Sequence, residues 1–189
     1  MAARTRVARG PTDPTRRDRI ADAALAIALE SGVEAVSHRA VAERSGVPLG
    51  STSYHFKSLD DLLVTAVERA TERYAEDLRR WSQAVADGGA DLVEVICDYV
   101  DTALGADRQR TRAAYDLYVA ALHRPALMAP ARAWAAVTSG ALERHASREA
   151  ARALTVLLDG VLIQALVGGA AMPRQEQARI LRAVLTALP

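Results

Sequence analysis

The segment SHRAVAERSGVPLGSTSYHFKSLDDLL, residues 37–63, carries the clearest structural signal in this chain. Ser37 is a good N-cap, because its hydroxyl can accept a hydrogen bond from a free backbone N–H at a helix start. Gly46 can adopt the left-handed conformation that ends a helix, and Pro48 suits the first turn of the next helix. The pattern predicts two short helices, at about 38–45 and 48–55, joined by a tight turn. This is the form of a helix-turn-helix, whose second helix enters the major groove of DNA.

A long helix is predicted directly after this motif. Ser58 and Asp61 have the spacing of a capping box, in which each side chain accepts a hydrogen bond from the other residue's backbone N–H. Apolar residues then recur at helical spacing through Ala70, Tyr74, Leu78 and Trp81, until Asp87-Gly88-Gly89 ends the pattern. Such a helix would belong to both halves of the molecule and could carry motion from a distant pocket to the DNA-binding end.

The remaining periodicity predicts six more helices, and therefore an all-α protein of about nine helices. Asp13-Pro14 reads as an N-cap followed by a proline at the first helical position, for a helix ending near Ser31. The later helices are expected at about 91–104, 107–123, 126–145, 147–171 and 173–188. The chain has one Phe and two Trp but abundant Ala and Leu, a composition that favours helices over sheets.

The distribution of charge is more informative than the net charge of +1. Residues 1–57 hold nine Lys or Arg against six Asp or Glu. A basic N-terminal arm is expected when one end of a protein contacts phosphates, although such arms are often only solvated tails.

No signal peptide is evident, and Asp159 and Gln164 interrupt the most membrane-like stretch, 153–172. We therefore expect a cytoplasmic protein, with the single Cys97 as a small buried hydrophobe.

Residues 14–63 resemble the DNA-binding segment of the TetR (tetracycline-repressor) family of bacterial transcription regulators. The matching residues are the run AVAERSGV at 40–47, then Gly50-Ser51, His55-Phe56, Ser58, Leu62 and Leu63. Two positions depart from the family pattern, since Ser53 stands where Tyr is usual and Leu59 where Lys or Arg is frequent. The resemblance implies a DNA-binding domain at 1–57 and an effector-binding and dimerisation domain at 58–189.

The resemblance also implies a role for each residue of the motif. The side chains that would face the bases are Leu49, Ser51 and Ser53. Those that would line the phosphate edge are Tyr54, His55 and Lys57, the only lysine in the chain. Those that would grip phosphate from the preceding helix are His38 and Arg39. Phe56 and Val47 are expected to hold the second helix on the core instead.

A small-molecule pocket is expected in the C-terminal half, because the family carries its effector site there. Binding cavities are mostly apolar with a few placed polar groups. The candidate lining residues are Trp81, Tyr99, Tyr115, Tyr118, Met128 and Trp134, with His123 and Gln164 as polar contacts. For each aromatic residue taken alone, ordinary core packing is the simpler interpretation.

The helix from Ser147 is apolar over more than one face, so we expect it to be buried both against its own domain and against a partner. The resemblance implies a homodimer through a four-helix bundle built from the last two helices of each subunit. The candidate interface residues are Leu154, Leu157, Leu158, Val161, Leu162, Ala165, Ile180 and Val184. The alternative is that this surface is internal to one subunit.

No catalytic, cofactor or metal motif stands out. The four histidines lack the spacing of a metal-binding helix, and no glycine-rich phosphate loop or nucleophile elbow occurs. We therefore expect no enzyme activity, no cofactor and no metal. The resemblance implies a ligand-responsive regulator, most often a repressor in this family. Such a regulator binds a palindromic DNA operator as a homodimer and is released by a small molecule. An all-α enzyme and a helical interaction module without DNA binding remain as alternatives.

Overall fold

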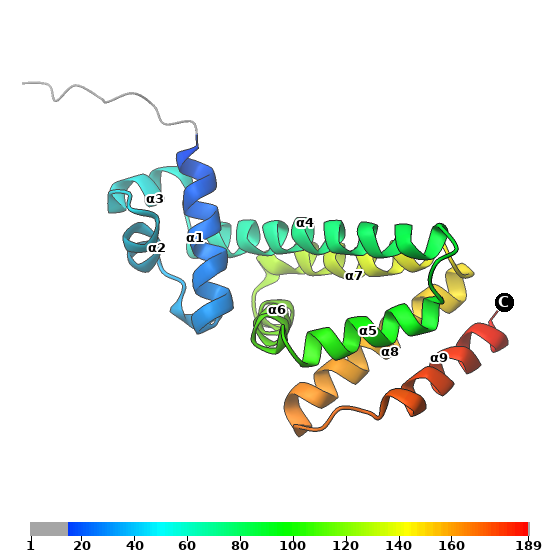
Figure 1. Cartoon of the computed structure of the whole chain (residues 1–189). Coiled ribbons are helices and arrows are strands. Elements are labelled where there is room, and N and C mark those ends of the chain that lie inside the picture. The colour runs from blue at the N-terminus through cyan, green and yellow to red at the C-terminus, as the bar shows by residue number, and fades with distance from the viewer. Residues whose placement is uncertain (1–14, 189) are drawn as a thin grey trace, which may run out of the picture.

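The computed structural model describes residues 15–188, which form helices and turns and contain no strand (Figure 1). The helices of this part of the chain are α1 (Arg16–Ser31), α2 (His38–Ser45), α3 (Leu49–His55), α4 (Leu59–Ala86), α5 (Leu92–Leu104), α6 (Arg108–Ala120), α7 (Met128–Leu142), α8 (Arg148–Gly168) and α9 (Arg174–Ala187). Two short 3₁₀ turns, Val33–Ala35 and Pro125–Leu127, complete it. The all-α prediction with nine helices is confirmed. The Asp13-Pro14 helix start and Arg4, Arg6 and Arg9 of the basic arm lie outside the described residues.

The helix boundaries follow from local chemistry. The Ser37 hydroxyl accepts a hydrogen bond from the Ala40 N–H at 3.1 Å, and Gly46 ends α2 in the left-handed conformation with φ of 67°. At the start of α4 the predicted capping box is present. The Ser58 hydroxyl accepts from the Asp61 N–H at 3.0 Å, and the Asp61 carboxylate accepts from the Ser58 N–H at 3.0 Å. The backbone N–H groups of Ser58 and Asp61, which have no partner within the helix, are thus both hydrogen-bonded where the helix-turn-helix meets α4.

The N-terminal core joins α1, α2, α3 and the first turns of α4. Its fully buried side chains include Ile20, Val41, Leu62 and Leu63, and Phe56 closes it from the end of α3 with 2% exposure. The expectation that Phe56 and Val47 hold α3 on the core is confirmed. Leu117 of α6 and Leu127 also belong to this core, so the helix-turn-helix region is packed against the rest of the chain.

A second core lies among α5, α7, α8 and α9 (Figure 1). Its buried side chains are Val93, Ile96, Cys97, Val100, Ala103, Leu142, Ala151, Leu154, Leu158, Val161, Leu162, Ala178 and Leu181. Cys97 has no exposed surface, as expected for a small hydrophobe. Among residues 15–188, α8 is the helix that is long and apolar enough to span a membrane on length and composition alone. Its inner side packs on this core, and Asp159 lies near its middle.

Helix α4 connects the two halves. It has 28 residues, and at 1.5 Å per residue it is about 42 Å long. Its first turns contribute to the N-terminal core, and beyond them it runs beside α7 (Figure 1). A single rigid helix therefore extends from the helix-turn-helix into the C-terminal bundle.

Candidate functional site

Helix α3 presents one face to its own core and another to solvent. Thr52 and Phe56 are buried, whereas Leu49 and Tyr54 are 52% and 74% exposed. Ser53 is exposed, and Ser51 is half-buried at the edge of the same surface. The short helix therefore offers Leu49, Ser51, Ser53 and Tyr54 on an open face, as a helix that reads the major groove requires.

The end of α3 gathers side chains that suit a phosphate backbone. The Lys57 ammonium lies 5.6 Å from the centre of the Tyr54 ring, and the His55 ring meets Tyr54 edge to face at 5.2 Å. Arg39 is exposed on the adjoining helix α2. A cation–π contact of this kind positions the ammonium group beside the end of α3.

His38 is held inside this motif more firmly than its exposed neighbour Arg39. Its Nδ1 lies 3.2 Å from the Thr52 Oγ1, and the Thr52 hydroxyl donates its proton to the Leu49 carbonyl at 2.7 Å. The half-buried His38 ring is thus linked through the Thr52 hydroxyl to the backbone of α3.

Ion pairs hold the reading helices on the rest of the molecule. The Arg44 guanidinium on α2 donates two hydrogen bonds to Glu30 on α1, at 2.6 and 2.5 Å, and these lower the pKa of the Glu30 carboxyl. On α4, Arg69 pairs with Asp18 and Asp22 of α1, and Arg73 pairs with Asp22 at 3.0 Å. Helix α1 is thus clamped to α2 on one side and to α4 on the other.

A cavity of about 540 Å³ lies between α4, α5, α6, α7 and α8, and α1 closes part of its wall through Leu25 and Leu29. The aromatic rings that line it are Tyr74, Trp81, Tyr99, Tyr115 and Trp134. Tyr74 and Trp134 are stacked, with ring centres 4.9 Å apart. The Trp81 Nε1–H donates to the Val95 carbonyl at 3.2 Å, which fixes that ring against α5. A cavity of this volume and composition is typical of small-molecule sites.

Polar groups interrupt this aromatic wall at several points. The charged residues among them are Arg73, Asp77, Asp98, Asp107, Arg110 and Asp159. The Tyr115 hydroxyl donates to the Asp159 carboxylate at 2.8 Å, and burial raises the pKa of Asp159. Burial, together with the nearby Asp159 charge, also raises the pKa values of Tyr74, Tyr99 and Tyr115, which keeps these phenols neutral.

The structure brings together four of the eight predicted pocket residues, namely Trp81, Tyr99, Tyr115 and Trp134. The other four do not line this cavity. Tyr118 lies one turn beyond the cavity along α6, and His123 follows the end of that helix on the surface. Met128 is 43% exposed at the start of α7. Gln164 comes five residues after Asp159, which rotates it about 140° around α8 and away from the cavity.

Tyr74 and the carboxylates of the cavity were not predicted from the sequence. Tyr74 belongs to the apolar stripe of α4, so its spacing alone gave no sign that it lines a cavity. The signal that could have found Asp159 is a carboxylate inside an otherwise apolar helix, which is costly to bury without a purpose.

Five of the predicted interface residues lie in the interior of the subunit. Leu154, Leu158, Val161, Leu162 and Ala165 are at most 8% exposed because they form the subunit's own core, so a partner has no access to them. The surface that α8 leaves open, here called the outer face of α8, carries the apolar residues Ala153, Val156, Gly160, Ile163 and Val167, with the exposed charged residues Glu149 and Arg152 towards its N-terminal end. Val156 and Val167 are 68% and 85% exposed. Leu157, Ile180 and Val184 are half-buried beside this surface.

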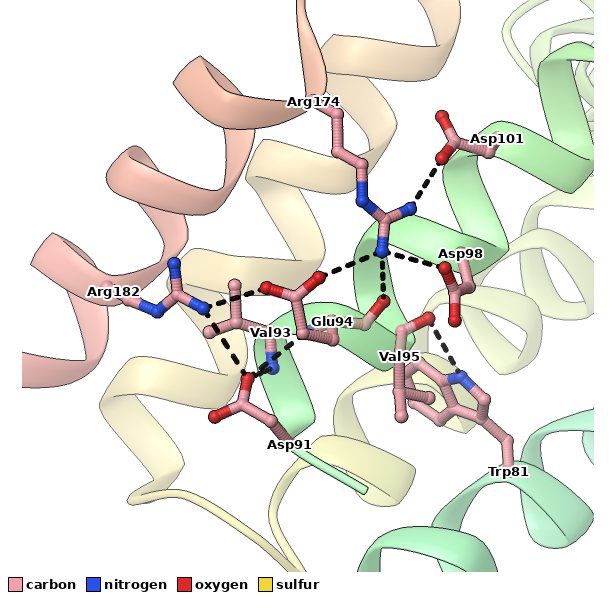
Figure 2. A network of polar contacts seen from close by, with 9 residues as sticks. All are labelled: Trp81, Asp91, Val93, Glu94, Val95, Asp98, Asp101, Arg174 and Arg182. Carbon is pink, nitrogen blue, oxygen red and sulfur yellow. Dashed lines mark hydrogen bonds and ion pairs between the residues drawn. The ribbon is translucent and has the colours of Figure 1, made fainter.

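Helix α9 is attached to α5 by a network of ion pairs, shown in Figure 2. The Arg174 guanidinium contacts Glu94 at 2.9 Å, Asp98 at 2.7 Å and Asp101 at 2.5 Å. Arg182 contacts Glu94 at 2.8 Å. These hydrogen bonds from Arg174 and Arg182 lower the pKa of Glu94. Asp98 also lines the cavity. Its negative charge is paired with the Arg174 guanidinium.

Comparison with known proteins identifies the family. The sequence model described as "Bacterial regulatory proteins, tetR family" matches residues 20–66, and the model "Tetracyclin repressor-like, C-terminal domain" matches residues 87–188. The chain belongs to the TetR family. A TetR-family chain is expected to be a DNA-binding transcription regulator, and the relatives below agree with this. In the described residues, no group of three or more His, Cys, Asp or Glu is placed to hold a metal ion.

The relatives of this TetR-family protein are regulators rather than enzymes. It is 53% identical over 58 residues to the HTH-type transcriptional repressor KstR of Mycolicibacterium smegmatis, a match that covers 31% of this chain and 28% of that repressor. It is 28% identical over 169 residues to the HTH-type transcriptional regulator BetI of Serratia proteamaculans, covering 84% of each. The crystal structure of the multidrug binding protein EbrR complexed with imidazole shares 38% identity and a TM-score of 0.81, covering 92% of this chain and 96% of that one.

Proposed function

We propose that this TetR-family regulator is a repressor that binds a palindromic operator as a homodimer and is released by a small molecule bound in the aromatic cavity. The observation that carries the proposal is the make-up of the cavity wall. Leu25 and Leu29 come from α1, which also forms the scaffold of the helix-turn-helix, while the other lining residues come from the C-terminal bundle. A ligand in the cavity would therefore touch the DNA-binding half directly. The protein would act in the cytoplasm, where operators are accessible.

The effector would be a largely apolar, planar molecule with one or two polar groups. The stacked pair of Tyr74 and Trp134 provides flat surfaces, and the phenol hydroxyls provide polar contacts at their edges. The structural relative EbrR supports this size and shape, since it has been crystallised with ethidium, with proflavin and with malachite green.

Helix α4 would transmit the presence of the ligand to α3. Arg73 lines the cavity and also pairs with Asp22 of α1, so a ligand that displaces it disturbs the clamp between α1 and α4. The capping box of Ser58 and Asp61 fixes α4 directly to the end of the helix-turn-helix. The ligand can weaken operator binding only by as much as its affinities for the two conformations differ.

The homodimer would form through the outer face of α8 together with the exposed side of α9. These apolar side chains follow one another at three- and four-residue spacing along α8, and only 44% of the most apolar window of this helix is buried within the subunit. A Cβ built on Gly160 would meet no atom within 4 Å, which leaves room for a partner's backbone to approach. A groove beside it would accept side chains of the second copy. It is lined by the apolar residues Ala153, Val156, Leu157, Val184 and Leu188 and by the charged residues Glu149 and Arg152.

On the operator, the open face of α3 would read base edges through Ser51 and Ser53. Short hydroxyl side chains allow the helix to sit deep in the groove, and Leu49 would contact thymine methyl groups. Tyr54, His55, Lys57 and Arg39 would contact phosphates, which position a protein without reading sequence. In the dimer, two such surfaces would meet the two halves of a palindrome.

Selection of a binding site from random DNA, followed by titration of a ligand, tests the proposal. The dimer should select a palindrome and release it at high salt, whereas a helical enzyme or interaction module would not be retained on DNA. In a Trp81→Phe variant, a ligand in the cavity should quench Trp134 fluorescence, and the same ligand should bind more weakly when operator DNA is present. If no palindrome is selected, or if ligand and DNA bind independently, the proposal fails.

A further inference from the structure

Some charged side chains of the aromatic cavity form ion pairs and others do not. Arg110 lies 3.7 Å from Asp77, Arg73 is paired with Asp22 of α1, and Asp98 is paired with Arg174 of α9 (Figure 2). Among residues 15–188, Asp107 and Asp159 are the lining carboxylates without an ion pair, and Asp107 is exposed to solvent whereas Asp159 is half-buried. The polar partner of Asp159 within residues 15–188 is the Tyr115 hydroxyl, and no Arg, Lys or His of that part of the chain forms an ion pair with it.

Asp159 is also the carboxylate that α8 contributes to the cavity wall. It is half-buried on the inner side of α8, next to Leu158 and close to Leu162, which line the same wall. A neutral hydrogen-bond donor such as Tyr115 only partly replaces water around a carboxylate, so a buried anion without a counter-ion is costly. A positive charge brought into the cavity would relieve this cost most, a neutral donor would relieve it only in part, and an anion would increase it.

The rings around Asp159 favour the same kind of charge. The faces of Tyr and Trp rings are negative, and they attract cations most strongly where water is excluded. Tyr74 and Trp134 are stacked, and Tyr74 and Tyr99 have ring centres 6.2 Å apart. A flat cation could lie against these rings with its charge directed at the carboxylate.

We infer that the effector is an organic cation, and that the Asp159 carboxylate on the inner face of α8 selects it by its charge. This inference rests on the proposed ligand-binding role of the cavity and adds the chemical class of the ligand. Asp159 acts as the counter-ion, Tyr115 holds the carboxylate in place through its hydroxyl, and the aromatic rings hold the apolar body of the ligand.

Two probes that share a ring system and differ in charge test this inference. Ethidium is a permanent cation, and phenanthridine is the uncharged ring system from which it derives. Their binding to the full chain, without DNA, is measured by calorimetry for the wild type and for Asp159→Asn, which keeps an oxygen acceptor for Tyr115. Asp116→Asn makes the same change of charge at an exposed residue of α6 outside the cavity and serves as the matched control.

The expected result is that Asp159→Asn weakens ethidium binding by about 10- to 100-fold, the loss typical of a hydrogen bond to a charged group, with no change for phenanthridine. Unchanged phenanthridine binding would also show that the cavity of the variant is intact. If ethidium binds equally well to Asp159→Asn and the wild type, or if Asp116→Asn loses as much affinity, the charge assignment is overturned while the cavity remains a ligand site. If neither probe binds the wild type and neither quenches Trp134, both the inference and the proposed ligand response fail.

Discussion

Replacing Val156 with arginine tests the proposed dimer at its most exposed point near the middle of α8. Burying a whole Val side chain contributes about 1.5 kcal/mol, and Val156 is 68% exposed in the subunit, so covering it in both copies contributes about 2 kcal/mol. Each introduced guanidinium would also lose its hydration at the interface, at a cost of several kcal/mol. The dimer should weaken by at least about 5 kcal/mol, which is roughly a 4,000-fold increase in its Kd.

Sedimentation velocity over a wide range of protein concentration measures this change, and circular dichroism checks that the helices remain. Leu122→Arg is the matched control, because Leu122 is 77% exposed after the end of α6 and lies off the outer face of α8. Leu158→Arg is the opposite control, since Leu158 is 4% exposed and the charge would unfold the subunit itself. A Val156→Arg protein that dimerises as tightly as the wild type would place the interface elsewhere and refute this reasoning.

Three further outcomes are expected. Lys57→Ala should weaken binding to operator and to random DNA alike and reduce the salt slope by about one unit in gel-shift titrations, and a loss limited to the operator would contradict the phosphate contact. Ser58→Ala should lower the free energy of unfolding by about 1 kcal/mol in denaturant titration, because the Asp61 N–H loses its acceptor, and an unchanged midpoint would show that the cap is not needed. Burial raises the pKa of the Asp159 carboxyl above its unfolded value of about 3.9. Its contribution to the free energy of unfolding is therefore fully present below this unfolded pKa, and it is lost as the pH rises through the folded pKa. Asp159→Asn should therefore melt above the wild type at neutral pH, and this difference should shrink in acid; a constant difference would argue against a buried charge.

The helices could be predicted closely because their ends depend on neighbouring residues. Ser37, Gly46, the Ser58 and Asp61 box and Asp91 each act within four residues of their own position, and all occupy the expected helix ends. The 3₁₀ turn at Val33–Ala35 was not predicted, because it depends on Gly32 adopting a positive φ of 86° after α1. The helix-turn-helix was also accessible from sequence, because Ser37, Gly46 and Pro48 mark the ends of its two short helices, while the orientation of Tyr54 was inferred from the family resemblance.

The cavity was only half predictable. The aromatic residues Trp81, Tyr99, Tyr115 and Trp134 could be proposed from their chemistry, but Tyr118 lies on the same helix as Tyr115 and one turn outside the cavity. Helical spacing predicts the face of the helix on which a residue lies. It does not predict where along that face the cavity ends, because this depends on the neighbouring helices. The Asp98 pair with Arg174 joins residues 76 positions apart, so no local pattern could indicate it.

Sequence alone therefore specified the helices, their order and the DNA-reading motif, because capping, helical periodicity and turn chemistry are local. Which side of α8 forms the subunit core was left open, since its apolar residues surround the helix and any side could face inward. Packing against α5, α7 and α9 settled it, burying Leu154, Leu158 and Leu162 and leaving Val156 and Val167 exposed. The same packing directs Asp159 into a cavity that exists only where five helices fail to fill the space between them.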